Sequence, residues 1–507
     1  MADPVDEYIT KTIKEGDKGS KLLAAKCAPT LKKPLVDIIS QGMGGIAVLR
    51  PPQDCVIAVH STGGDNHISD LRRYVGSVVR KMVQDSHRIG ATPLGFGNVV
   101  DASSMDLSMI TIIGDQLRKS AEDFNLPVMN GELADLGTRV NCQANLSGTM
   151  ISALPRSSHF ASIIPGIFEY DGITYAVFDP QGKPVFINCD GIGTKTEFYE
   201  RLLETYMASA LAATALLNYD YDSPYKEIPC GAEDFAAMNL DDTAKLGARA
   251  HVLSGVIETK GRLPVRLIKE KLIRITDAFG VLGILQHEAV ESRLLGYRSE
   301  APAYNISGSA VSTIDEERLK NLPKPQEGES LIAICGGSNP RSNGISAKRK
   351  TMSRLFGERW HETREGRIFL DYLTKPSTIL YPVFTNLLQR ELATSVFHNS
   401  GGAYDGKLAR PLAKHNLFVD IKKLFEPDWR EVALAAYSLS VKDAYGKYPM
   451  GTDGFVSTSR PEEAINTIHA MGFNALNAGK LEKAVDGRTG VKLIAFNGQE
   501  VYFSGRD

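Results

Sequence analysis

Hydrophobic and polar residues are arranged along the chain in a way that predicts a mixed α/β protein. Two short apolar runs that end at glycine-rich turns, CVIAVH at 55–60 and PVFINC at 184–189, are typical of buried strands. In SMITIIGDQLRKSAEDF at 108–124 and LPVRLIKEKLIRITDAF at 263–279, apolar residues recur every three to four positions, which predicts amphipathic helices. Strand and helix signals continue to the end of the chain, so we expect an α/β (α+β) fold.

A short pattern occurs twice in the same order, which predicts an internal duplication. NLSGTMIS at 145–152 and NISGSAVS at 305–312 are identical at four of eight positions. Upstream of each, an aspartate, Asp85 or Asp242, is followed five residues later by Gly-Ala. Each copy reads as strand, long helix, strand, helix, strand, strand. The alternative is chance similarity between two α/β segments, but the shared order of the landmarks favours duplication.

The chain changes character near residue 328, which predicts a third domain. GESLIAIC at 328–335 is typical of a buried strand, and AKRKTMSRLF at 347–356 indicates a basic helix. We expect EGRIFLDYLTKPS at 365–377 to be a loop and the following TILYPVFTNLLQRE to be a helix. KNLPKPQEGES at 320–330 carries two prolines and several charges and is the expected linker. The predicted domains are residues 1–158 and 159–325, which are the two copies, and 326–507.

Composition and charge indicate an ordinary globular protein. Charged residues make up 23% of the chain and the formal net charge is -2, so we expect no general attraction to nucleic acid or anionic membrane. The six cysteines include no C-x-x-C pair, which favours a reducing compartment. The apolar run at 207–217 is shorter than the about 20 residues that span a bilayer. We therefore expect a cytoplasmic protein, in which local basic sites could still bind a phosphorylated small molecule; whether it forms homo-oligomers stays open.

Two stretches of the second copy carry candidate chemistry. In Cys189–Lys195, an acid ends an apolar strand and two glycines and a lysine follow, which suits a magnesium-phosphate site as well as it suits a plain turn. In Asp234–Asp242, Asp234, Met238 and Asp242 lie at four-residue spacing on one helical face, with Asn239 and Asp241 to either side. A solvated helix face is the alternative. The apolar residues between the acids favour burial, and buried unpaired carboxylates would need a cation such as Mg²⁺.

The two copies complement each other in their polar loops. The first copy has an acid pair, Glu132 and Asp135, after a strand, and the corresponding stretch of the second copy, Gly283–Glu288, has lost the first acid. Conversely, the first copy's counterpart of Cys189–Lys195 is Gly63–His67, which has neither the leading aspartate nor the lysine. Each copy keeps what the other lacks.

The C-terminal segment contains two further loops that could bind a ligand. Ser338–Gly344 follows a strand and opens a basic helix, so its backbone N–H groups and Arg341 form a candidate anion site. An ordinary Asn-Gly turn is nearly as good an interpretation. His398–Gly402 could bind a ligand through backbone amides, although a single histidine before glycines is more often structural.

Taken together, these motifs resemble those of the aminoimidazole ribonucleotide (AIR) synthetases, or phosphoribosylformylglycinamidine cyclo-ligases. The family patterns are approximately D-G-V-G-T-K, D-x-x-A-M-x-x-N-D-x-x-x-x-G-A, G-G-E-T-A-E-M, H-S-N-G-x-S-x-x-R-K and H-x-T-G-G-G. The matching stretches are Asp190–Lys195, Asp234–Ala248, Asn130–Leu136, Arg341–Lys350 and His398–Gly402. Their order is that of the family, except that the acidic motif comes from the earlier copy.

The resemblance implies a fold in which the two copies pair into a pseudo-dimeric β-barrel with ATP at their interface. It therefore implies one composite site, to which the first copy contributes Glu132 and Asp135. It implies catalytic roles for Asp190, Lys195, Asp242 and Asn343. ATP and its phosphates would be bound by Gly191, Gly193, Thr194, Asp234, Asn239 and Glu132, and Mg²⁺ by Asp190, Asp242, Asp234, Glu132 and Asp135. The substrate would be bound by Arg341, Ser342, Gly344, His398, Gly401 and Gly402.

The implied reaction is the cyclisation of formylglycinamidine ribonucleotide, in which ATP phosphorylates the amide oxygen before the ring closes. Two departures from the family pattern bear on it: Arg341 replaces the histidine before S-N-G, and Ala403 replaces the third glycine of H-x-T-G-G-G. The segment between Lys195 and Asp234 is also longer, with NYDYDSPY at 218–225 as an expected lid or interface. A superfamily enzyme with another substrate, and a non-catalytic nucleotide-binding or assembly protein, are the alternatives.

Overall fold

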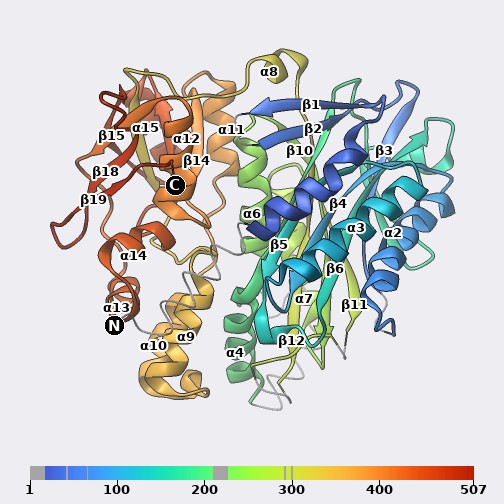
Figure 1. The fold of residues 1–507 in the computed structure, drawn as a ribbon, viewed down its shortest axis with the longest axis horizontal. Helices are drawn as coiled ribbons and strands as arrows, with labels where there is room; N and C mark the ends of the chain where they lie inside the picture. The colour runs from blue at the N-terminus through green and yellow to red at the C-terminus, as the bar shows by residue number, and fades with distance from the viewer. Residues whose placement is uncertain are drawn as a thin grey trace. The chain divides into compact units, whose positions relative to one another are not determined.

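The computed structural model describes residues 18–41, 44–64, 67–208, 227–290, 293–297 and 301–506. These residues form two compact units (Figure 1). The first unit contains the residues up to Asn239 together with Arg249–Glu316, and the second contains Leu240–Ala248 together with Glu317–Asp507. The tyrosine-rich segment at 218–225, expected to be a lid or an interface, lies outside the described residues.

The first unit contains two six-stranded sheets. The first sheet has the order β5-β4-β6-β3-β8-β7, from β3 (Cys55–Gly63), β4 (Thr92–Ala102), β5 (Val128–Asp135), β6 (Ala144–Pro155), β7 (Gly166–Tyr170) and β8 (Ile173–Phe178). The second sheet has the order β1-β2-β9-β12-β10-β11, from β1 (Val36–Gln41), β2 (Gly44–Leu49), β9 (Val185–Gly191), β10 (Arg249–Lys260), β11 (Leu282–Ala289) and β12 (Ala303–Thr313).

Four strands of each sheet are arranged in the same way. The order β5-β4-β6-β3 of the first sheet matches β11-β10-β12-β9 of the second. In both, the first pair is parallel and the other two pairs are antiparallel. A register shift interrupts the long antiparallel pair at matching places, between Pro93 and Gly95 in β4 and between Ala250 and Val252 in β10. The predicted succession of strands and helices is therefore confirmed for both sheets.

Each sheet is completed by a hairpin from the other predicted copy. The hairpin of β1 and β2 precedes β3 in sequence, but β2 pairs with β9 through Leu49 and Val185. The hairpin of β7 and β8 precedes β9, but β8 pairs with β3 through residues such as Val177 and Ala58. The sequence patterns did not predict this exchange of hairpins.

Amphipathic helices cover these sheets, and their ends are fixed by the sequence. They are α2 (Leu71–Arg88), α3 (Leu107–Asp123), α4 (Thr196–Met207), α6 (Ala232–Ala244) and α7 (Val265–Asp277). Asp70 and Asp106 are the N-caps of α2 and α3, because each side chain accepts a backbone N–H of the first turn. Helices α2 and α3 lie side by side on the first sheet (Figure 1) and enclose an apolar core with Ile110, Leu117 and Phe96. Helices α3 and α7 confirm the two predicted helices.

The two sheets of the first unit face each other through a shared core and reciprocal polar contacts. The apolar part includes Val59, Val99 and Ile151 of the first sheet and Ile187, Val252 and Val311 of the second. Asn145 donates to Glu258, and Asn305 donates to Asp101 over 2.6 Å. Asn145 and Asn305 occupy the same register position in their sheets, and so do Asp101 and Glu258. Each sheet therefore donates an asparagine hydrogen bond to an acid of the other sheet at the same register position.

The second unit is built on one seven-stranded sheet of order β14-β16-β13-β17-β15-β18-β19. The strands are β13 (Ser330–Cys335), β14 (Ser395–His398), β15 (Leu417–Ile421), β16 (Gly454–Thr458), β17 (Asn474–Lys483), β18 (Gly490–Ile494) and β19 (Glu500–Phe503). The helices of this part of the chain are α8 (Glu316–Lys320), α9 (Ile345–Phe356), α10 (Arg364–Leu373), α11 (Tyr381–Gln389), α12 (Arg410–Lys414), α13 (Trp429–Ser438), α14 (Val441–Lys447) and α15 (Pro461–Ala470).

The expectation of a loop at 365–377 is wrong, because most of that stretch forms α10. Thr363 caps its first turn by accepting the N–H of Gly366, and Leu370 and Leu373 are buried. The predicted strand at 328–335, the basic helix and the helix after residue 378 are confirmed as β13, α9 and α11. Within the described ranges, no helix has both the length and the apolar character that crossing a membrane requires. All six cysteines are described, and each is a free thiol.

Candidate functional site

In the first unit, the predicted phosphate loop begins where β9 ends. The Asp190 carboxylate accepts the N–H of Gly191 over 2.7 Å, and Gly193 has a φ of 56°, a conformation that glycine adopts without strain. A Cβ at Gly191 would lie 3.3 Å from the carbonyl oxygen of Ile306, so this position has little room for a side chain. Gly193, Thr194 and Lys195 form the 3-10 turn η4 (Gly193–Lys195), which runs directly into α4.

The lysine of this loop is held inside the first unit by an acid. Lys195 and Asp234 are fully buried, and Lys195 Nζ lies 2.6 Å from Asp234 Oδ1. Tyr199 on α4 donates its hydroxyl to the other oxygen of Asp234, and burial raises the pKa of Tyr199 well above its ordinary value. Asn239 donates to the carbonyl oxygens of Asp190 and Phe235 at 3.4 and 3.1 Å. The loop after β9 is therefore tied to α4 and to α6.

The acidic stretch of the first copy, Asn130–Leu136, lies beside this loop. Asn130 of β5 donates to the carbonyl oxygen of Ile187 in β9 over 2.9 Å. A Cβ at Gly193 would lie 3.8 Å from Leu136 Cδ2. Arg139, in the turn after β5, is buried and pairs with Glu200 of α4 at 2.6 and 3.0 Å. These contacts join the acidic stretch of the first copy to β9, η4 and α4 of the second.

The negative charges of Glu132 and Asp190 both influence the pKa of the Cys189 thiol, which belongs to β9. Burial, together with the negative charges of Glu132 and Asp190, raises the pKa of Cys189 to about 12. Both acids are partly exposed. Asp135, further along the same loop, accepts the N–H of Gly137 over 2.9 Å. Of the acids predicted to bind Mg²⁺, Glu132 and Asp190 are the pair that the first unit brings near one buried group.

The opposite edge of the two sheets lacks both acids. Thr62 pairs with Gly148 just as Asp190 pairs with Gly308, so threonine stands where the other edge has aspartate. Gln286 pairs with Val256 just as Glu132 pairs with Val99, so an amide stands where the other edge has a carboxylate. The two edges are therefore built alike but differ in charge, and only one carries the acid pair.

The magnesium expectation rested partly on buried acids being unpaired, and that premise is wrong. Asp234 is paired with Lys195, and in the second unit Asp241 is paired with Arg341. Asp242 contacts Lys245 and lies 3.0 Å from His398 Nε2, and the nearby positive charges hold its pKa well below the ordinary value despite burial. Over the described part of the chain, no three His, Cys, Asp or Glu side chains are grouped as a metal ion would need.

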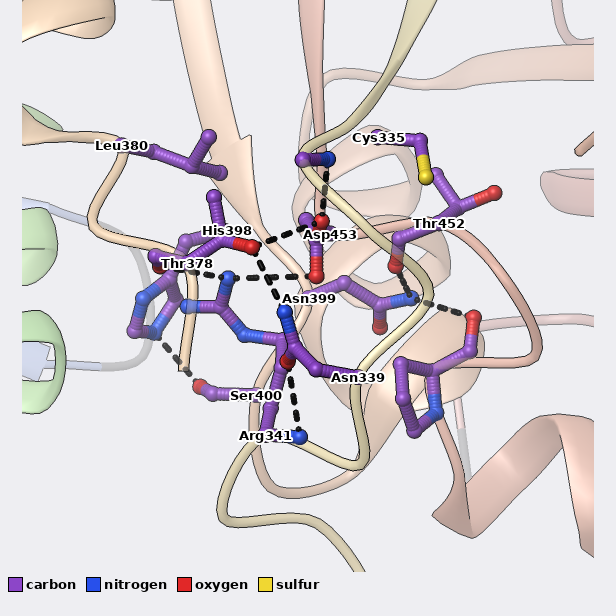
Figure 2. Close-up of polar contacts among 12 residues, drawn as sticks. Cys335, Asn339, Arg341, Thr378, Leu380, His398, Asn399, Ser400, Thr452 and Asp453 are labelled. Carbon is purple, nitrogen blue, oxygen red and sulfur yellow. Dashed lines mark hydrogen bonds and ion pairs between the residues drawn. The ribbon is translucent and has the colours of Figure 1, made fainter. Parts of the chain in front are cut away.

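In the second unit, Arg341 is the centre of a buried network (Figure 2). The Arg341 side chain is fully buried, and its Nη2 donates to Asp241 Oδ2 over 3.0 Å. Its Nη1 donates to the carbonyl oxygen of Thr378 over 3.1 Å and lies 3.7 Å from Asp453 Oδ1. Asn339 fixes the backbone at this point, because its Oδ1 accepts the N–H of Arg341 over 3.0 Å. The guanidinium expected to bind substrate is thus surrounded by internal partners.

The predicted His398 loop is tied to the loop that carries Asn343. His398 Nε2 lies 2.5 Å from Ser400 Oγ, and His398 is fully buried (Figure 2). Asn343 donates to the carbonyl oxygens of Asn399 and Ser400 at 3.3 and 2.9 Å. Asn399 in turn donates to the carbonyl oxygens of Pro449 and Thr452, which anchors the loop from the other side (Figure 2).

Other predicted ligand groups of these two loops lie nearer the surface. Gly401 and Gly402 are exposed, and Ser342 and Gly344 are partly exposed. Gly344 has a φ of 59° and is the N-cap of α9, so the first backbone N–H groups of that helix follow it directly. The second unit therefore brings the two predicted substrate loops together, with Asn343 and His398 inside and the glycines outside.

Sequence reasoning missed several residues that hold these loops. Asp453 accepts the N–H of Gly336 over 2.6 Å and the hydroxyl of Thr378 over 3.0 Å. Nothing in the sequence around 453 marks it, since a lone aspartate before a glycine is typical of any turn. Arg139 was also missed, although an arginine just after the acidic motif was a usable signal.

Comparisons with known proteins agree with the motifs. No family model matches the chain. The phosphoribosylformylglycinamidine cyclo-ligase of Prochlorococcus marinus subsp. pastoris is 22% identical over 343 residues, which covers 64% of this chain and 88% of that protein. The enzyme of the same name from P. marinus strain MIT 9301 is 26% identical over 266 residues, covering 50% and 67%. Hydrogenase maturation protein HypE in complex with ATP matches with a TM-score of 0.37 and 14% identity, over 53% of this chain and 77% of that one.

Proposed function

We propose that this chain, which resembles the AIR synthetases in sequence, is an ATP-dependent enzyme that activates an amide oxygen by phosphorylation. The reaction we propose is the cyclisation of formylglycinamidine ribonucleotide to aminoimidazole ribonucleotide. Relatives with the cyclo-ligase name support it, as do the five motifs, four of which are in family order. The observation that carries the proposal is the pairing of the acidic loop at Asn130–Leu136 with the loop at Asp190–Lys195.

We infer that the first unit arose by duplication and works as an internal pair. The matching strand orders, the matching register shifts and the reciprocal contacts of Asn145 and Asn305 support this. Under this proposal the copies correspond to residues 1–158 and 159–325, with hairpins exchanged between them, and residues 326–507 form the third domain. Domain pairing within one chain supplies what two identical subunits would otherwise provide.

In the proposed nucleotide site, the loop after β9 faces the acids of β5. At Gly193 no side chain blocks the approach of phosphate oxygens to the backbone, and Thr194 follows it. Mg²⁺ on a nucleotide needs only one or two carboxylates besides phosphate and water, and Asp190 and Glu132 would supply them. The ion would screen the negative charge of the phosphates. Lys195, paired with Asp234, sets the position of η4 and α4 from inside.

We propose that the loops of the second unit bind the phosphorylated substrate. The first N–H groups of α9, next to Ser342 and Gly344, suit a phosphate group because the helix start is positively polarised. The exposed backbone of Gly401 and Gly402 adds further donors. Asn343 holds the two loops in register, and His398 supports the second. Catalysis would then be largely positioning and charge stabilisation: the amide oxygen attacks the γ-phosphorus, ADP leaves, and the ring nitrogen displaces phosphate.

The test is turnover with purified protein, Mg-ATP and formylglycinamidine ribonucleotide, following ADP and the arylamine product. We expect both products in equal amounts. Glu132→Gln and Asp190→Asn should each lower kcat by about 100-fold or more, because each removes charge stabilisation at the nucleotide. The matched control is Gln286→Ala, at the register position of Glu132 on the opposite edge, which should keep activity. The composite site is refuted if Glu132→Ala leaves activity intact while Asp190→Ala abolishes it.

One observation favours a second candidate, an ATP-dependent enzyme of the same kind with another substrate. The family pattern has a histidine where this chain has Arg341, and the Arg341 side chain is buried among internal partners. A protein that hydrolyses ATP but gives no product with formylglycinamidine ribonucleotide would support this candidate. Nucleotide binding without any turnover would instead indicate a binding or assembly protein.

A further inference from the structure

Arg341 replaces a family histidine, and its surroundings give it a different task from binding substrate. Its side chain is fully buried, and its backbone has a φ of 46°, which non-glycine residues rarely adopt. The second unit nevertheless accommodates it, with Asn339 accepting its N–H. A residue kept in this conformation needs strong local interactions, which indicates that the side chain stabilises the loop.

The guanidinium joins three segments that are far apart in the sequence. Asp241 belongs to Leu240–Ala248, Thr378 precedes α11, and Asp453 precedes β16. Nη2 donates to Asp241. Nη1 donates to the carbonyl oxygen of Thr378 and lies near the carboxylate of Asp453 (Figure 2). No shorter side chain presents several N–H donors in this fixed fork, so lysine and histidine cannot make the same set of contacts.

The partners of Arg341 extend the network to further parts of the second unit. Asp241 Oδ1 accepts the N–H groups of Leu380 and Tyr381, both at 2.8 Å, and so caps the start of α11. Asp453 accepts the N–H of Gly336, at the beginning of the loop that carries Arg341. Burial raises the pKa of Asp453, and the charge of Arg341 opposes that rise. The arginine is therefore the cation that lets two acids remain buried in this loop cluster.

We propose that Arg341 is a positioning residue that fixes the loop Gly336–Gly344, and with it the start of α9, without contacting the substrate. This rests on the proposed binding of a phosphorylated substrate by that loop. A histidine at this position, as in the family pattern, would give Asp241 and Asp453 no permanently charged partner. This chain supplies that partner with Arg341. The contacts of the Arg341 side chain inside the second unit thus explain why this chain has arginine where the family pattern has histidine.

The proposal is tested with steady-state kinetics on Arg341→Lys, Arg341→His and Arg341→Met, with Arg460→Lys as a control at an exposed ion pair. For the lysine and histidine variants we expect the KM for the phosphorylated substrate to rise about tenfold or more, because the loop shifts when the fork is lost. The KM for ATP should change less than about twofold, because the proposed nucleotide residues belong to the first unit.

The distinguishing readout is rescue by a second substitution. Asp241→Asn keeps an oxygen for the N–H groups of Leu380 and Tyr381 but removes the charge that Arg341 balances. If Arg341 is a positioning residue, Arg341→Met with Asp241→Asn should recover much of the substrate affinity that Arg341→Met alone loses. If Arg341 contacts substrate, adding Asp241→Asn to Arg341→Met does not restore substrate affinity. In that case Arg341→Lys also keeps the KM within about threefold, because its charge still meets phosphate. Either result overturns the proposal.

Two further measurements keep the result decisive. If circular dichroism shows that Arg341→Met does not fold, Arg341→Lys alone decides. A rise in KM of about tenfold or more supports the proposal, and a KM within about threefold of the native value overturns it. If the native protein shows no cyclo-ligase turnover, the proposed reaction fails, and the affinity of the same variants for ribose 5-phosphate is measured by calorimetry instead. Loss of that affinity in Arg341→Lys supports the positioning role; unchanged affinity, or no binding by the native protein, refutes it.

Discussion

Raising the pH should weaken the first unit through a buried acid pair that joins its two sheets. Asp101 and Glu258 are fully buried, and each is bonded by the asparagine of the opposite sheet. Burial raises the pKa of Asp101 to about 7 and that of Glu258 to about 8, and the charge of Asp101 adds to the second rise.

The direction of the effect follows from linkage. The folded-state pKa of each acid lies above its unfolded value of 3.8 or 4.5, so the folded protein binds more protons across the interval between them. Stability is therefore greatest below the unfolded pKa and is lost as the pH rises through about 7 and 8. For Asp101 the pKa difference of about 3 corresponds to about 4 kcal/mol of unfolding free energy. Arg139 near Asp101 opposes the effect, and Glu288 near Glu258 enhances it.

The assay is urea unfolding between about pH 5 and about pH 8.5 for the native protein, Asp101→Asn and Glu258→Gln. Hydrogen exchange of the β6 and β12 amides reports on the first unit. The substituted side chains cannot ionise but keep the shape of the acids, and the amide introduced in Asp101→Asn could donate to Asn305 Oδ1. We expect the native protein to lose stability relative to each variant by about 1.4 kcal/mol per pH unit within the titration window. A stability difference that stays constant across this range would refute the reasoning.

Two further substitutions test the backbone and charge assignments. Ala403→Gly should raise the unfolding free energy by about 1 kcal/mol, because Ala403 has φ 40° and ψ -131°, where a Cβ is strained; a melting temperature at or below that of the native protein would contradict this. Lys195→Met should cost about 3 kcal/mol by leaving Asp234 buried beside Tyr199 without its cation, and Asp234→Asn in the same chain should recover most of it. An additive double variant in urea unfolding would show that the two groups do not interact.

The sequence by itself determined the elements and their order, because these depend on local patterns. The apolar runs and helical periodicity predicted β3, β9, α3 and α7, and the repeated N-x-S-G pattern predicted β6 and β12 as counterparts. The capping residues Asp70 and Asp106 lie directly before the helices they begin. Where a second local signal was ignored, the prediction failed: Thr363 and Gly366 mark the start of α10, in a stretch taken for a loop.

Only the tertiary structure decided which distant groups meet. The exchanged hairpins, the pairing of Lys195 with Asp234 and that of Arg341 with Asp241 each depend on contacts across many residues of chain. The acids of Asp234–Asp242 looked like a metal site in sequence because Lys195 and Arg341, which pair with Asp234 and Asp241, lie far from them in the chain. Burial makes a partner necessary, but a one-dimensional pattern does not say whether that partner is a metal ion or an arginine a hundred residues away.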